Sequence, residues 1–163
     1  MNRALILACG NVIRGDDGVA PFIARYLASN FCDPQTEIHS SQQWTPELAE
    51  IISQSEMVIF LDASAALPPG EVQTQRIAAG ALPAGRLTHS VNPGELLALA
   101  ERLYGRVPET VFLLTIGGQS FELEEKFSEP VRLAIPAVIT QIKALLSGVS
   151  QPELLIRSQS ANS

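Results

Sequence analysis

Three short, almost entirely apolar runs limit what this chain can fold into. They lie at residues 4–9, 57–61 and 111–116. Apolar runs of this length, bounded by turn signals, are typical of strands buried on both faces, as in a parallel sheet. Because helices have to cover both faces of such a sheet, the runs predict an α/β architecture.

Amphipathic segments separate these runs. After the first run, the apolar positions 19, 22, 23, 26 and 27 recur at helical spacing. Residues 45–52 predict a second helix, with Thr45 as its cap and Pro46 at its first position. Asn92 and Glu95 begin a third helix with a pattern close to a capping box, and residues 128–146 predict a last helix, which Pro136 should start or kink.

Further strands are predicted at residues 37–41 and 72–77, the latter alternating like an edge strand. The complete order is β-α-β-α-β-β-α-β-α. This order predicts a three-layer α/β/α sandwich with a twisted, mostly parallel mixed sheet of about five strands.

Composition and charge narrow the possible functions. We expect residues 1–150 to form one domain and residues 151–163 to be a polar, disordered tail. The net charge of −6 and the absence of a basic stripe argue against nucleic acid and anionic membranes as partners. No apolar run is long enough to span a membrane, and no signal pattern begins the chain. With Cys9 and Cys32 expected to be reduced thiols, these features predict a cytoplasmic protein.

The segment 10–18, Gly-Asn-Val-Ile-Arg-Gly-Asp-Asp-Gly, is the most informative motif. It places Asp16 and Asp17 on a glycine-flanked turn between the first strand and the first helix. In an open α/β sheet this is the rim where ligands bind. A purely structural role as helix N-cap is the alternative for either carboxylate.

Two other residues, like Asp17, are predicted to lie where a strand ends or a helix is about to begin. Asp62 follows the buried run at 57–61, and His89 precedes the helix that Asn92 begins. Loops at one sheet edge converge, so two carboxylates and an imidazole could meet there and bind a divalent ion such as zinc or nickel. Alternatively, Asp62 belongs to an ordinary turn and His89 makes ordinary hydrogen bonds.

Several familiar motifs are absent from the sequence. The glycine-rich turn lacks the spacing of dinucleotide-binding and P-loop motifs, and there is no Gly-x-Ser-x-Gly elbow or His-Glu-x-x-His pair. Nucleotide binding, serine hydrolysis and zincin chemistry are therefore unsupported. We expect His39 to be structural, and Trp44 to be a half-buried packing residue or else a surface anchor for a partner.

At these residues the chain resembles the [NiFe]-hydrogenase maturation proteases, which trim the C-terminus of the hydrogenase large subunit. The matching segments are 10–18, Phe-Leu-Asp-Ala at 60–63, and Thr-His-Ser-x-Asn-Pro-Gly-Glu-Leu-Leu at 88–97. Their order and spacing match over nearly all of residues 3–147. The segment 43–49, Gln-Trp-Thr-Pro-Glu-Leu-Ala, is similar to the branch that serves NAD-reducing, bidirectional hydrogenases.

The resemblance implies that Asp17, Asp62 and His89 contact a metal. This metal would be nickel carried by the large-subunit precursor, with zinc or cadmium as substitutes in vitro. Many members have an acidic residue at the end of the second strand, where this chain has Ser40. Gln43 is our candidate for contacting substrate instead.

The implied activity is one cut in a nickel-loaded precursor by a monomeric enzyme. The metal could polarise the scissile carbonyl or lower the pKa of a bound water. Alternatively, Asp16 or Asp17 acts as general base. A non-catalytic module that binds or escorts the nickel centre, and a small-molecule metal hydrolase with a deep closed pocket, are the competing interpretations.

Overall fold

The computed structural model describes residues 2–31, 33–80 and 91–148. Within these residues a five-stranded sheet has the order β2-β1-β3-β5-β4. The parallel strands are β1 (Asn2–Cys9), β2 (Thr36–Ser41), β3 (Ser55–Ser64) and β5 (Thr110–Gly117). The edge strand β4 (Val72–Arg76) pairs antiparallel with β5. The predicted mixed sheet is confirmed.

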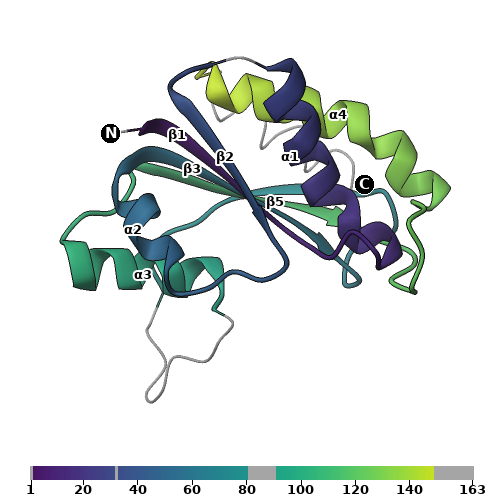
Figure 1. Cartoon of the computed structure of the whole chain (residues 1–163), viewed down its shortest axis with the longest axis horizontal. Helices are drawn as coiled ribbons and strands as arrows, with labels where there is room; N and C mark the ends of the chain where they lie inside the picture. Colours follow the sequence, from purple (N-terminus) through teal and green to yellow (C-terminus); the bar gives the residue numbers. More distant parts are fainter. Residues whose placement is uncertain (1, 32, 81–90, 149–163) are drawn as a thin grey trace.

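Helices cover both faces of this sheet (Figure 1). On one face lie α1 (Val19–Asn30) and α4 (Glu129–Leu146), and on the other lie α2 (Leu48–Ser53) and α3 (Pro93–Tyr104). Successive strand residues supply the two cores, since Ile6 packs with the first pair of helices and Leu5 and Leu7 with the second. The three-layer prediction is therefore confirmed. None of the described helices has the length and apolar character that a bilayer crossing requires.

The ends of α3 follow from local sequence. Asn92 caps the helix, because its Oδ1 accepts a hydrogen bond from the backbone nitrogen of Glu95 over 2.8 Å. Pro93 occupies the first turn, and Gly105 ends the helix with a φ of 68°. The predicted cap is confirmed, although the Glu95 carboxylate contacts the Asn92 side-chain amide rather than its backbone.

The start of one helix differs from prediction, and the start of another agrees with it. Thr45 does not cap α2, which begins at Leu48 after a turn in which Leu48 N donates to Thr45 O. That turn uses the i→i+3 spacing, so the expected helical start is replaced by a tighter connection. The helix predicted over 128–146 is confirmed as α4, which begins at Glu129 and contains Pro136 in its interior rather than at its start. Pro130 suits its position in the first turn, where a missing backbone N–H costs little.

Strand β3 is longer than its apolar run. It extends to Ser64, so Asp62 lies within the strand, opposite Thr115, rather than just after it. Backbone pairing with β5 continues where the apolar pattern stops, because ladder hydrogen bonds do not require apolar side chains. The predicted tail at 151–163 and Cys32 lie outside the described residues.

Candidate functional site

The turn after β1 carries the adjacent carboxylates. A 3-10 helix, η1 (Gly15–Gly18), leads directly into α1. The N-cap of α1 is Gly18, so neither Asp16 nor Asp17 is the ordinary helix cap that was the structural alternative. The turn also approaches β1 closely, because a Cβ on Gly10 would lie 1.9 Å from the carbonyl oxygen of Asp17. Glycine at position 10 is therefore a packing requirement.

Asp17 lies at the carboxyl end of the sheet. Its Oδ2 accepts a hydrogen bond from the backbone nitrogen of Asn11 over 2.7 Å, which closes the turn across six residues. This bond orients the carboxylate without neutralising it, since a backbone amide carries no net charge.

Asp62 projects from β3 beside this turn. Burial raises its pKa to about 6, the hydrogen bond from Ala63 N opposes that rise, and the charge of Asp17 adds to it. The interaction between the two carboxylates indicates that they are near neighbours. The structure thus brings together two of the three residues predicted for a metal site. The third, His89, lies outside the described residues.

Cys9, which the sequence predicted to be a reduced thiol, lies near the same two carboxylates. Burial, together with the charges of Asp62 and Asp17, raises the pKa of the Cys9 thiol to about 12. Its Sγ donates to the carbonyl oxygen of Gln42 over 3.4 Å. A thiol held in this protonated form is a poor nucleophile, which argues against cysteine-protease chemistry. The position of Cys9 at the end of the first predicted strand was the sequence signal that could have placed it near these carboxylates.

An open cleft of about 680 Å³ adjoins this region, with Cys9 and Asp62 in its lining. Its lining comes from the segment after β2, from β3 and β5, and from the start of α3, and it includes Gln43, Asp62 and Glu95. Of the described lining residues, none is Lys or Arg. The cleft therefore combines acidic and amide groups, as a site for a cation or for a polar peptide segment requires.

Asp16 is not among the described residues that line this cleft, and it is fully buried. Burial alone would raise its pKa, but hydrogen bonds from Ser120, Ser128 and Gln119 outweigh that effect and lower the pKa. A carboxylate stabilised in this way binds a proton weakly, so it is poorly suited to act as a general base.

The carboxylates of Asp17 and Asp62 supply part of what a divalent metal site needs. Two oxygen donors lie close together, and a cation between them would relieve both the repulsion and the burial that raise the pKa of Asp62. Among the described residues, however, no group of three His, Cys, Asp or Glu side chains is arranged to hold a metal ion. A third ligand would have to come from elsewhere.

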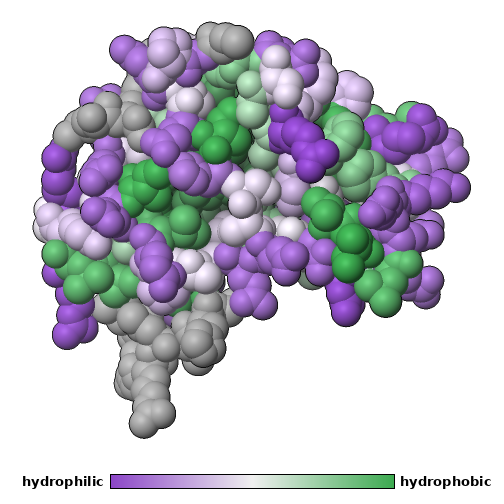
Figure 2. Space-filling view, in the orientation of Figure 1, coloured by the Kyte–Doolittle hydropathy of each residue, from purple (hydrophilic) through white to green (hydrophobic). Residues whose placement is uncertain are grey.

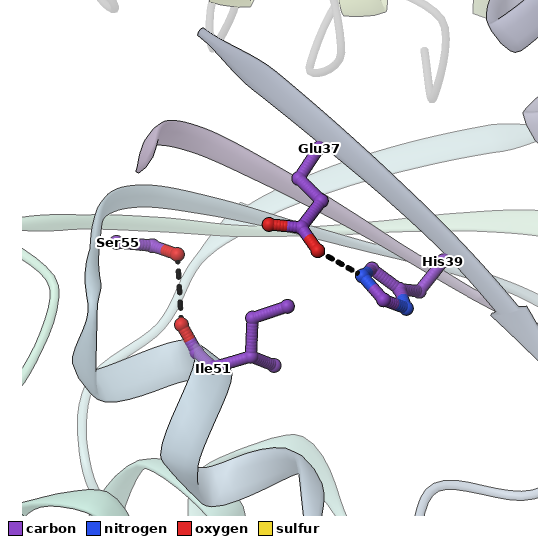
Figure 3. Close-up of polar contacts among 4 residues, drawn as sticks. All are labelled: Glu37, His39, Ile51 and Ser55. Atoms are coloured by element: carbon purple, nitrogen blue, oxygen red, sulfur yellow. Dashed lines mark hydrogen bonds and ion pairs between the residues drawn. The ribbon is translucent and has the colours of Figure 1, made fainter. Parts of the chain in front are cut away.

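Two residues outside the carboxylate pair also had predicted roles. Figure 3 shows His39 pointing toward Glu37 on the edge strand β2, with Nε2 and Oε1 2.6 Å apart. Trp44 is only 7% exposed and packs edge-to-face on Phe60, with ring centroids 5.3 Å apart. It is therefore a packing residue and not an exposed anchor.

An apolar surface adjoins the turn that carries Asp17. Val12 and Ile13 are 49% and 47% exposed, and Phe22 on α1 is 45% exposed although its spacing had predicted a buried face. Figure 2 shows apolar side chains gathered where η1 and the segment before α4 lie in Figure 1. A second groove of about 360 Å³ lies there, lined in part by Val12, Phe22 and Phe127.

Comparison with known proteins gives no match to a protein-family model and none to a curated protein. Solved structures do match. Hydrogenase maturating endopeptidase HybD from E. coli has a TM-score of 0.73 and 22% identity, covering 90% of this chain and 94% of its own. The [NiFe] hydrogenase maturation protease HybD from Thermococcus kodakarensis has a TM-score of 0.66 and 25% identity, covering 88% and 98%.

A hydrogenase 2 maturation peptidase from Thaumarchaeota archaeon SCGC_AB-539-E09 is similar as well. Its TM-score is 0.66 at 24% identity, with 90% of this chain and 99% of that one covered. The likeness extends over nearly the whole length of both chains in each case. The fold of this chain is that of the solved hydrogenase maturation endopeptidases.

Proposed function

We propose that this protein is an endopeptidase that removes the C-terminal extension of a nickel-loaded [NiFe]-hydrogenase large-subunit precursor. The observation that carries the proposal is the interacting pair Asp17 and Asp62, of which Asp62 lines an open cleft, in a fold shared with named maturation endopeptidases. The fold alone would not be sufficient, because one fold supports many activities.

The form of the cleft supports a protein substrate. It is open, and the turn with Asp17 continues into the exposed apolar side chains of Val12 and Ile13. Exposed apolar surface of this kind is typical of contacts with another protein. A small-molecule hydrolase would instead need a deep, closed pocket.

In the proposed reaction, Asp17 and Asp62 contact nickel that the precursor already carries, and His89 completes the set. Bound there, a divalent metal supplies a Lewis acid next to the scissile carbonyl or the attacking water. The Asp17 carboxylate, whose described hydrogen bond comes from Asn11 N, can also accept a proton from that water. Gln43, on the cleft wall, is positioned to contact the extended segment of the substrate.

The finer assignments belong to the same proposal. We place the enzyme in the cytoplasm as a monomer that meets its precursor transiently. The segment 43–49 favours a large subunit of the NAD-reducing, bidirectional type.

A processing assay tests the proposal. Precursor of a candidate large subunit is prepared with nickel and without it, mixed with this protein, and followed by mass spectrometry. We expect cleavage of nickel-loaded precursor and none of the metal-free precursor or of a short peptide that spans the cut. Efficient cleavage of the free peptide would make this a general peptidase.

A non-catalytic escort is the second candidate function. The same carboxylate pair would bind the nickel centre without cutting the chain. Stable co-purification with nickel-loaded precursor, without any change in precursor mass over a prolonged incubation, would favour this function over proteolysis.

A further inference from the structure

Asp16 connects two segments that are far apart in the sequence. Its Oδ2 accepts hydrogen bonds from Gln119 N, Ser120 N and Ser128 Oγ over 2.7, 3.0 and 2.7 Å. Its Oδ1 accepts from Ser128 N over 2.8 Å. One buried carboxylate in η1 therefore holds both ends of the segment 119–128, which leads into α4.

The backbone reinforces this connection. Asp16 N donates to Ser120 O over 2.8 Å, and Gly15 N donates to Glu124 O over 2.7 Å. Gly15 has a φ of 54°, and a Cβ there would lie 2.6 Å from Ser120 O. The two segments are thus in direct backbone contact, and a displacement of one has to be accommodated by the other.

Ser128 gives up its usual role in making this contact. It is the N-cap residue of α4, yet its side chain makes no capping hydrogen bond and donates to Asp16 instead. In the described part of the chain Asp16 has no ion-pair partner. Its charge is met by amide and hydroxyl groups at the N-terminus of α4, where the helix dipole favours an anion.

The geometry of η1 separates the roles of the two neighbouring carboxylates. Consecutive side chains of a 3-10 helix point about 120° apart, since it has about three residues per turn. Asp16 therefore points into the protein while Asp17 reaches Asn11 N. Fixing the orientation of Asp16 also fixes the orientation of Asp17.

We propose that Asp16 is a positioning residue that acts through its contact with Ser128, Gln119 and Ser120 to hold Asp17 in its working orientation. The expected effect on catalysis rests on the proposed function, whereas the expected effect on the orientation of Asp17 does not. Asp16 itself touches no substrate. Loosening the segment 119–128 should therefore displace Asp17 without removing any group from the cleft.

Two variants test this inference. Asp16→Asn removes the negative charge. It also replaces one acceptor oxygen with an amide group, whose hydrogens point toward the groups that donate to the Asp16 carboxylate. Ser128→Ala removes only the hydroxyl bond and leaves Asp16 in place. Ser147→Ala is the matched control, because the Ser147 hydroxyl also lies at an end of α4 but bonds only Ala144 O.

The first readout is hydrogen exchange of the Asn11 amide, which reports directly on its bond to Asp17 and requires no substrate. We expect exchange at Asn11, Gln119 and Ser120 to be about tenfold faster or more in Asp16→Asn, less accelerated in Ser128→Ala, and unchanged in Ser147→Ala. Core amides of β3 should keep their protection in all three proteins. Unchanged exchange at Asn11 in both test variants would overturn the inference. If Asp16→Asn fails to fold, unchanged exchange at Asn11 in Ser128→Ala alone would overturn it.

The second readout is processing of the nickel-loaded precursor. For Ser128→Ala we expect kcat to fall several-fold while KM and the pH profile keep their values, since the titrating groups of the cleft remain. A shifted pH profile, or loss of activity in Asp16→Asn without faster exchange at Asn11, would instead identify Asp16 as a base. If no protein processes any precursor while exchange at Asn11 responds as expected, the proposed function fails and the positioning role stands.

Discussion

Asp62 lies on β3 beside the turn that carries Asp17, and the charge of Asp17 adds to burial in raising the pKa of Asp62 to about 6. Two carboxylates placed together at the end of a sheet oppose folding unless something compensates for them. A cation between them would reduce that cost, so the electrostatics of the pair favour a positively charged ligand.

Asp62→Asn should keep the fold and abolish processing. The amide is nearly isosteric with the carboxylate, so packing survives, whereas the anionic metal contact is lost. Circular dichroism and the mass-based processing assay check this outcome. Glu56→Gln is the control, because Glu56 is an exposed carboxylate near the opposite end of β3. Processing at the normal rate by folded Asp62→Asn would remove this carboxylate from the reaction.

The stability of the metal-free protein should depend on pH through Asp62. Its folded pKa of about 6 lies above the ordinary value of 3.8, so between these values the folded state binds the proton more tightly. Stability from this group is present at low pH and is lost as pH rises through about 6, by at most about 3 kcal/mol. Asp62→Asn should lack this loss and be the more stable protein at neutral pH.

Urea unfolding of both proteins at several pH values, in the presence of a chelator, measures this effect. The difference in free energy of unfolding between them should grow as pH rises from about 4 to about 7. A constant difference over that range would show that the pKa of Asp62 is not raised by folding.

Divalent metal should bind weakly and reversibly, and His89 should contribute to the affinity. Asp17 and Asp62 supply only part of a coordination sphere, and imidazole binds metal in its neutral form. Affinity should therefore fall below about pH 6.5, the ordinary His pKa. Calorimetric titration with nickel or zinc, with and without His89→Ala, measures this. Equal affinity of the two proteins would exclude His89 from the site.

Gln43→Ala should weaken substrate recognition while leaving the fold intact. Gln43 is exposed on the wall of the cleft, so its loss costs little packing. We expect a several-fold increase in KM for nickel-loaded precursor with little change in kcat, as for a residue that binds substrate and transition state alike. A fall in kcat at constant KM would instead place Gln43 in the chemical step.

Trp44→Phe should change stability little, despite removing part of a buried ring. The Trp44 Nε1 is buried and has no hydrogen-bond partner among the described residues. An unmet buried donor costs about 1–3 kcal/mol, which offsets the contact area that the smaller ring loses. The free energy of unfolding should stay within about 1 kcal/mol of the parent value. A loss well beyond that would indicate that the indole nitrogen is satisfied.

The sequence by itself determined the features that depend on short-range chemistry. The apolar runs predicted the central strands, and the Asn-Pro-Gly-Glu start at 92–95 predicted the cap of α3, because each signal acts within a few residues. The predicted neighbourhood of Asp17 and Asp62 also followed from the sequence, since parallel strands bring their carboxyl ends to one edge.

Only the tertiary structure distinguished the surroundings of Asp16 from those of Asp17. In the sequence the two are adjacent carboxylates in one turn, and either could have been a base or a helix cap. The partners that distinguish Asp16 lie 103 to 112 residues away, in a segment whose position depends on how α4 packs beside α1. No local pattern encodes such a contact, because the hydrogen-bond donors become neighbours only once the sheet and its helices have assembled.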